Sequence, residues 1–311
     1  MMKISKTVQE ASIVYRHYLL KLLVAIALNL GTLSVCTAAT DCKAVTEIST
    51  AECESLLALY HDTVGTHWKN NKDWNVTNTP CSWKGVTCES GVKKIKLDHN
   101  NLKGTIPNFS ALPHLQTLSF SYNQLTGTIP DFSALPSLQM LDLQSNQLTG
   151  TIPNFSALPS LQVLDLQSNQ LMGTIPDFSG LPHLQKLDLQ SNQLTGTLPD
   201  FSGLPHLQIL WLSDNQLTGT IPNFSTLPFL QMLILFDNQL SGAIPDFSAL
   251  PHLQMLFLNN NQLTGAIPHF SASPNLSMIV LVNNHSFCEI PNIDYSGLLI
   301  VVESFPYCEI K

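Results

Sequence analysis

Basic residues are scarce in this 311-residue chain, and charged residues of both signs make up only 12% of it, against about a quarter in an average globular protein. The chain has one arginine, Arg16, and from Thr105 onward it has two lysines, Lys186 and Lys311, against thirteen acidic residues. Such a surface repels phosphate groups, so we expect no binding to nucleic acid or to anionic membranes.

Long apolar runs are missing after residue 39, which argues against a later membrane span, since a span needs about 20 apolar residues. Residues 1–39 have the order of a secretory signal peptide: basic residues, an apolar run from Leu22 to Val35, then small residues. We expect cleavage after Ala39, with a retained leader or lipidation at Cys36 as alternatives. The protein is therefore predicted to be secreted or to lie at the cell surface, and to be a monomer.

Motifs of catalysis are missing as well. No nucleophile motif, phosphate-binding loop or metal-ligand spacing occurs, so we predict that the chain is not an enzyme and uses no cofactor. Histidines recur in the sequence Leu-Pro-His, but no acid or nucleophile recurs beside them. We interpret these histidines as surface residues: His114, His183, His206 and His252.

Repetition is what the sequence has in abundance. A glycine opens each unit with a strict period of 23 residues, at Gly104, Gly127, Gly150, Gly173, Gly196, Gly219, Gly242 and Gly265. A fixed period of this length is typical of a solenoid. In LQMLDLQSNQL, Leu141 and Leu143 alternate with Asp142 and Gln144, which predicts a short strand with the leucines inward. Stacked units would pair these strands in one parallel sheet.

Two further columns of identical residues are predicted to be structural. The asparagine column can satisfy backbone groups of the turns, because a carboxamide both donates and accepts hydrogen bonds; it comprises Asn100, Asn123, Asn146, Asn169, Asn192, Asn215, Asn238, Asn261 and Asn284. The phenylalanine column is expected to fill the other side of the core; it comprises Phe109, Phe132, Phe155, Phe178, Phe201, Phe224, Phe247 and Phe270.

All cysteines beyond the leader lie outside the repeats, at Cys42, Cys53, Cys81, Cys88, Cys288 and Cys308. An even number in an exported chain favours disulfides, although six cysteines allow 15 connectivities. Proximity suggests that neighbours in this order are paired. Zinc is the alternative, but the spacing of CSWKGVTC does not fit it and no CxxC is present.

The unit LxxLxLxxNxLxGxIP resembles the plant-type leucine-rich repeat over residues 92–285, with about nine repeats. The resemblance implies an α/β repeat solenoid: a horseshoe or superhelix with a parallel concave sheet, a mostly loop or 3-10 convex side, and a second short strand at LTGTIP. The family's usual unit is one residue longer, so the back of the solenoid can curve or twist differently here.

Both ends are predicted to carry caps, at residues 40–91 and 286–311. Trp74 followed by PCSWKGVTC resembles the N-terminal cap of plant receptor and inhibitor ectodomains, which implies a bond between Cys81 and Cys88. Upstream, STAECESLLALYHDTVG predicts a helix with a capping box at Ser49 and Glu52. Its apolar face is Leu56, Leu57 and Tyr60. At the other end, Cys288 and Cys308 are expected to close the last repeat.

Binding residues are expected where the outward strand positions vary. The position between the inward leucines reads Lys96, Ser119, Asp142, Asp165, Asp188, Trp211, Ile234, Phe257 and Val280. The second half of this column, together with residues two positions later in the same units, predicts an exposed apolar patch with an acidic rim. The patch is Trp211, Ile234, Phe236, Phe257, Val280 and Val282, and the rim is Asp214 and Asp237. Such a patch is typical of a macromolecular contact. Two alternatives need no ligand. In one of them the C-terminal cap folds over Val280 and Val282, and in the other the repeats have diverged to apolar residues without a functional consequence.

Three aspartates in register, Asp142, Asp165 and Asp188, would repel one another across neighbouring strands. Solvation with raised pKa values, a basic partner and a calcium ion are the alternatives for what offsets this repulsion. We predict that the chain is an extracellular recognition module for a protein. The alternative is an adhesin for a wall polysaccharide that stacks on Trp211 and Phe257, and a hydrolase with an unrecognised site is a third class.

Overall fold

The computed structural model describes residues 39–247, 249–268, 270, 273–285, 287 and 299–301. Predictions for the leader, for Cys36 and for a bond between Cys288 and Cys308 concern residues outside these ranges. From Thr40 onward the chain forms one compact unit.

The N-terminal part of this unit contains the helix α2 (Thr50–Asp62) and the short 3-10 helices η1 (Gly65–His67) and η2 (Pro80–Ser82). The predicted capping box is confirmed: the backbone N–H of Glu52 donates to Ser49 Oγ, and the backbone N–H of Ser49 donates to Glu52 Oε2 at 2.9 Å. The predicted apolar face packs against the core, with Leu57 partly buried, and Leu59, which was not predicted, is fully buried as well.

Three buried tryptophans and two disulfides hold this part together. The rings of Trp68 and Trp83 lie 5.0 and 4.8 Å from that of Trp74. Bonds join Cys42 to Cys53 and Cys81 to Cys88, the pairs that sequence proximity suggested. A small domain with few strands gains stability from such crosslinks.

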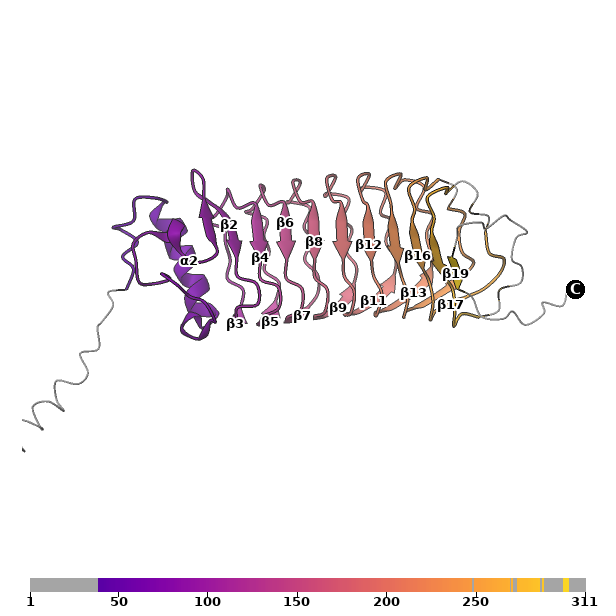
Figure 1. Cartoon of the computed structure of the whole chain (residues 1–311), viewed down its shortest axis with the longest axis horizontal. Coiled ribbons are helices and arrows are strands. Elements are labelled where there is room, and N and C mark those ends of the chain that lie inside the picture. Colours follow the sequence, from indigo (N-terminus) through magenta and orange to yellow (C-terminus); the bar gives the residue numbers. More distant parts are fainter. Residues whose placement is uncertain are drawn as a thin grey trace, which may run out of the picture. The chain divides into compact units, whose positions relative to one another are not determined.

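The repeats build an 11-stranded sheet in the order β1-β2-β4-β6-β8-β10-β12-β14-β16-β18-β19 (Figure 1). Its strands are β1 (Val86–Cys88), β2 (Val92–Lys96), β4 (Thr117–Ser119), β6 (Met140–Asp142), β8 (Val163–Asp165), β10 (Lys186–Asp188), β12 (Ile209–Trp211), β14 (Met232–Ile234), β16 (Met255–Phe257), β18 (Met278–Val280) and β19 (Leu299–Val301). All pairings are parallel except that of β1 with β2. The predicted parallel solenoid is confirmed. Strand β19 extends its sheet into the segment predicted as a C-terminal cap.

A second, 8-stranded parallel sheet runs alongside the first (Figure 1). Its strands are β3 (Lys103–Thr105), β5 (Gln124–Thr128), β7 (Gln147–Gly150), β9 (Gln170–Thr174), β11 (Gln193–Thr197), β13 (Gln216–Thr220), β15 (Gln239–Gly242) and β17 (Gln262–Leu263). The repeated glycine has a positive φ, for example 80° at Gly150, which favours glycine. A Cβ there would also lie 2.8 Å from Thr128 Cγ2. Both constraints explain why glycine recurs.

The core lies between these sheets and the turns behind them. The inward leucines Leu141 and Leu143 are fully buried, and so are their equivalents in the other repeats. The phenylalanine column is buried throughout, and successive rings such as Phe224 and Phe247 lie 6.3 Å apart. Its predicted core role is confirmed.

The asparagine column ties each turn to its neighbours. Asn192 Nδ2 donates to the carbonyls of Leu189 in its own turn and Leu166 in the preceding one, at 3.1 Å each. Its Oδ1 accepts from the backbone N–H of Leu171 at 3.0 Å. Equivalent bonds recur along the column, for example at Asn146 and Asn238. The predicted structural role is therefore confirmed.

Removal of one side chain of the asparagine column should destabilise the solenoid. In Asn192→Ala the buried N–H of Leu171 loses its acceptor, and we expect a loss of about 2–3 kcal/mol in the free energy of unfolding. Urea unfolding followed by circular dichroism measures it. The matched control is Gln193→Ala, because Gln193 is the exposed neighbour. Equal urea midpoints for the two variants would contradict the role assigned to the column.

Candidate functional site

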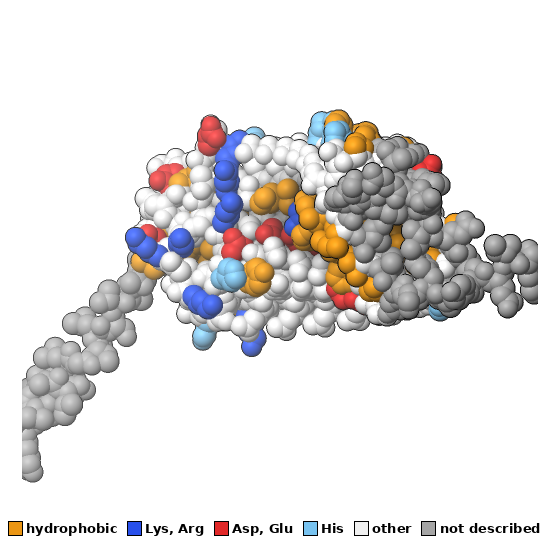
Figure 2. Space-filling model, turned by 45° about the vertical axis from the view of Figure 1, so that its right-hand side comes forward, with side chains coloured by type: hydrophobic (Ala, Val, Ile, Leu, Met, Phe, Trp, Pro, Cys, Tyr) orange, Lys and Arg blue, Asp and Glu red, His pale blue; other side chains and the backbone are white. Residues whose placement is uncertain are grey.

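The outward side chains of the 11-stranded sheet form columns, because the strands pair in register. We call this surface the open face. Its central column is continuous through the pairs Asp142 with Asp165, Asp165 with Asp188, Asp188 with Trp211, Trp211 with Ile234, Ile234 with Phe257, and Phe257 with Val280. In Figure 2 acidic side chains gather near the middle of the molecule, with hydrophobic side chains beside them.

The apolar residues of the predicted patch adjoin one another but are less exposed than expected. Ile234 is only 6% exposed. The remaining members are half-buried: Trp211, Phe236, Phe257, Val280 and Val282. A flat sheet packs neighbouring large side chains against one another, so each covers part of the next. Ile234 therefore serves mainly as packing, and its neighbours present most of the accessible apolar surface.

A further outward column was missed in the sequence. It lies two residues before the central column on each strand, and in its second half it reads Lys186, Ile209, Met232, Met255 and Met278, which pair in that order. All five are half-buried. The period-two alternation of a strand could have revealed it. The methionines widen the apolar half of the open face with side chains that adapt their shape easily.

Lys186 places a positive charge beside two of the three aspartates. Its Nζ lies 2.6 Å from Asp165 Oδ2 and 3.2 Å from Asp188 Oδ2. Asp165 is 3% exposed and Asp188 is fully buried, so solvation does not offset the repulsion at these two positions. A compensating charge comes from the same chain.

Burial and mutual repulsion perturb these carboxyl groups. Burial, together with the charge of Asp165, raises the pKa of Asp188 to about 6, against the opposing effect of Lys186. Burial also raises the pKa of Asp142, with contributions from Asp165 and Asp98, while hydrogen bonds from Gln144 oppose the shift. Lys186 therefore compensates the ladder only in part.

The two halves of the open face meet at Trp211. The Lys186 ammonium lies 5.2 Å from the centre of the Trp211 ring, a distance suited to a cation–π contact. Trp211 Nε1 and Ser213 Oγ are both buried and have no hydrogen-bond partner. Buried donors without acceptors are uncommon in folded proteins, and here two of them sit together on one strand and its extension.

The predicted acidic rim forms a polar row beside the apolar half. Asp214 and Asp237 are half-buried and have a φ of 54°. Asn260 Nδ2 donates to Asp237 Oδ1 at 2.6 Å, and Asn283 Nδ2 donates to Asn260 Oδ1 at 2.6 Å. Burial and the charge of Asp237 raise the pKa of Asp214. The rim is thus an ordered row rather than a set of free carboxylates.

The histidines of the Leu-Pro-His sequence are exposed, as predicted. The structure adds that three of them form a stack with Phe229: the rings of His183 and His206, of His206 and Phe229, and of Phe229 and His252 lie 6.0–6.1 Å apart and nearly parallel. Their faces cover one another, so they do not offer a flat platform to a sugar ring.

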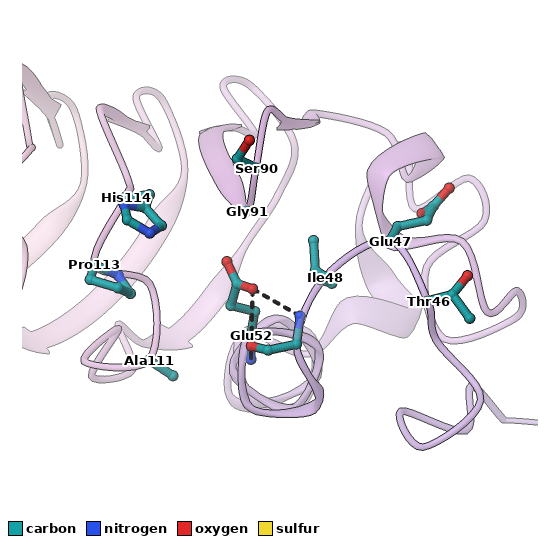
Figure 3. Close-up of a pocket in the computed structure, with 10 residues that line it drawn as sticks. Thr46, Glu47, Ile48, Glu52, Ser90, Gly91, Ala111, Pro113 and His114 are labelled. Carbon is teal, nitrogen blue, oxygen red and sulfur yellow. Dashed lines mark hydrogen bonds between the residues drawn. The ribbon is translucent and has the colours of Figure 1, made fainter.

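A pocket of about 490 Å³ lies where the N-terminal part meets the first repeat (Figure 3). Glu52 lines it, but its carboxylate is already engaged: Oε2 accepts from Ser49, and Oε1 accepts from the backbone N–H of Val92 at 2.9 Å. Glu47 on the other side accepts from the backbone N–H of Cys81. Glu52 thus joins the helix to the sheet, and Glu47 joins the segment before the helix to η2, so we assign the pocket a structural role.

Within the described part of the chain, no three His, Cys, Asp or Glu side chains are grouped so that they could hold a metal ion. The same part of the chain contains no helix that is long and apolar enough to cross a membrane.

The raised pKa of Asp188 should make stability depend on pH. The folded state binds this proton more tightly than the unfolded state, so the stabilisation is complete below about pH 4 and is lost as the pH rises through about 6. We expect the free energy of unfolding to fall by about 2 kcal/mol over this range relative to Asp188→Asn. Urea titrations at several pH values test it, with Asp200→Asn, an exposed acid, as control. Parallel profiles for the wild type and Asp188→Asn would refute it.

Three family models match the chain. The leucine rich repeat model matches residues 90–148, and the model of two leucine rich repeat copies matches residues 136–181, 182–227 and 228–265. The leucine rich repeat N-terminal domain model matches residues 51–89. None of these models describes an enzyme. The comparison with curated proteins gives no match.

Solved structures with the same fold include plant receptors. The plant peptide hormone receptor RGFR1 in complex with RGF2 is 36% identical, with a TM-score of 0.60 over 62% of this chain and 32% of that one. PEPR1 in complex with AtPEP1 is 28% identical, with a TM-score of 0.68 over 81% of this chain and 41% of that one. This chain therefore spans well under half of either receptor chain.

A plant ice-binding protein matches almost over its full length. It is 29% identical, with a TM-score of 0.62 over 85% of this chain and 99% of that one. The fold, the repeat models that together span residues 90–265 and the N-terminal domain model lead to one assignment. The chain belongs to the leucine-rich repeat family.

Proposed function

We propose that this protein is a secreted or cell-surface recognition module that binds a protein or peptide through the open face. The observation that carries the proposal is the change in that face between β10 and β12, from carboxylates to Trp211, Phe257 and the methionine column. One of the similar structures is a plant peptide hormone receptor, RGFR1, in complex with RGF2, which supports the choice of a peptide or protein over other ligands.

Binding would depend on a surface that is already formed. The asparagine column holds successive strands in register, so the outward side chains keep their spacing without a ligand. A preformed surface loses little conformational entropy on association. Trp211 and Phe257 are large, half-buried aromatic residues at the centre of the columns, the type that contributes most to interface energies.

The first test removes the two aromatic residues. We expect Trp211→Ser, Phe257→Ser to lose the extracellular ligand captured by the mature wild type, because these side chains supply much of the apolar contact area. Captured species are identified by mass spectrometry, and their affinity for both proteins is then measured by calorimetry. Circular dichroism checks that the variant is folded.

The matched control is Met172→Ser, Phe229→Ser, which removes two exposed apolar side chains away from the open face. If the aromatic variant still captures the ligand, or if the control variant loses it equally, the open face is not the binding site. A parallel panel of wall polysaccharides tests the adhesin alternative. A polysaccharide ligand should bind with little dependence on salt, whereas a ligand that also contacts the aspartates should weaken as salt rises.

The 8-stranded sheet favours a second candidate function, contact with ice. Its outer threonine column is exposed on six successive turns: Thr105, Thr128, Thr151, Thr174, Thr197 and Thr220. The methyl of each packs toward the glycine of the next turn, as Thr174 Cγ2 does toward Gly196, so the side chains share one orientation. They repeat about every 4.8 Å. From β5 to β17 the strands carry no charged residue.

In a regular array of this kind each side chain can contact a repeating solid weakly, and the many identical contacts add up. The plant ice-binding protein shares the fold. We expect the wild type to inhibit ice recrystallisation and Thr174→Lys, Thr197→Lys to lose this effect, because two lysines interrupt the flat row. The aromatic open-face variant is the control and should keep the effect. An inactive wild type, or an active lysine variant, rules this candidate out.

A further inference from the structure

The open face divides into sections of different charge along the sheet. Its acidic section covers β6–β10, where three carboxylates face one ammonium group, that of Lys186. Asp142 is left without a cation among the described residues; the hydrogen bonds to its carboxylate come from Gln144 alone. A carboxylate of raised pKa beside two others is a favourable position for a ligand cation, which would relieve the repulsion.

The acidic section is bounded on its N-terminal side. Strand β2 presents Lys94 and Lys96, both exposed, and they lie in the same columns as the outward residues of β6. Those lysines would repel a cationic ligand that extended past β4. The basic part of a ligand should therefore be short and confined to β6–β10.

On the C-terminal side, β12–β18 present an uncharged apolar section. Methionine, aromatic and branched side chains fill its two inner columns, and the acidic rim lies to one side. Charged groups lose hydration when they are pressed against such a surface without partners. The part of a ligand that lies here should be apolar.

The boundary between the sections lies at Trp211, whose ring centre is 5.2 Å from the Lys186 ammonium. Trp211 Nε1 and Ser213 Oγ are buried without a hydrogen-bond partner, and Asp188 Oδ2 on the neighbouring strand has only its ion pair with Lys186. Because these atoms are closed off from the surface, they do not identify a ligand. The order of the sections favours an extended ligand: they follow one another along a single run of strands, β6–β18, so one chain laid along that run meets both.

We infer that the occupant of the open face is an extended peptide segment with a basic end over β6–β10 and an apolar end over β12–β18. This inference rests on the proposed function and specifies the ligand's chemistry. From β6 to β18 the sheet has six strand-to-strand steps, or about 29 Å at about 4.8 Å per step. An extended chain covers that span with about nine residues.

Two synthetic nine-residue peptides of equal composition test whether the basic and the apolar residues of the ligand must form separate blocks. One has three lysines, two glycines and then Leu-Phe-Leu-Phe; the other interleaves the lysines with the apolar residues. Fluorescence anisotropy with the mature protein measures their affinities at low and high salt. We expect the block peptide to bind about tenfold more tightly and to weaken more with salt, since only it can match both sections at once.

Asp142→Asn tests where the basic end lies. We expect it to weaken the block peptide about fivefold and to reduce its salt dependence, with little effect on the interleaved peptide. The control is Asp131→Asn, an exposed acid in a turn where other repeats have asparagine. Asp131→Asn should keep the wild-type urea midpoint, and Asp142→Asn should keep or raise it, because the substitution removes a charge that burial and Asp165 disfavour.

The outcomes separate this inference from the function on which it rests. If both peptides bind equally and lose affinity in Trp211→Ser, Phe257→Ser, the open face binds peptides but the order of the blocks is wrong. A block peptide that binds tightly but ignores Asp142→Asn overturns the placement of the basic end. If neither peptide binds, peptide recognition by this face is itself contradicted.

Discussion

Every feature of this solenoid depends on the hydrogen bonds that the asparagine column makes between turns. From Asn123 onward each side chain donates to carbonyls of its own turn and the preceding one and accepts an N–H from the preceding turn, as Asn192 does with Leu189, Leu166 and Leu171. A buried carboxamide satisfied in this way allows no slip of one turn against the next, because a slip would leave several buried groups unpaired. The register of both sheets follows from that constraint.

Fixed register makes neighbouring turns chemically dependent on one another. Asp165 and Asp188 can be buried side by side because a lysine stands two residues before one of them and reaches both. Without the constant spacing between strands, the same three residues would have no common geometry. The open face therefore acts as one surface, although each strand contributes only two or three side chains to it.

The two sheets use the repeat in opposite ways. On the 8-stranded sheet the outward residues barely change, because the glycine and the threonine methyl of successive turns must pack together. On the open face nothing in the core constrains the outward positions, so they vary from strand to strand. Constancy suits contact with a repeating solid, and variation suits recognition of a particular partner.

Several features could be predicted from the sequence because they depend on spacing along the chain. They are the period, the inward leucines, the asparagine and phenylalanine columns and the capping box at Ser49. The columns of the open face followed from the same alternation, apart from the one that holds Lys186. Other features needed the tertiary structure: the contacts of Lys186 with Asp165, the burial of Ile234, the unpartnered donors at Trp211 and Ser213, and the place of β19 in the sheet. They depend on how far a side chain reaches across turns and on what covers it, and residue order alone does not specify either.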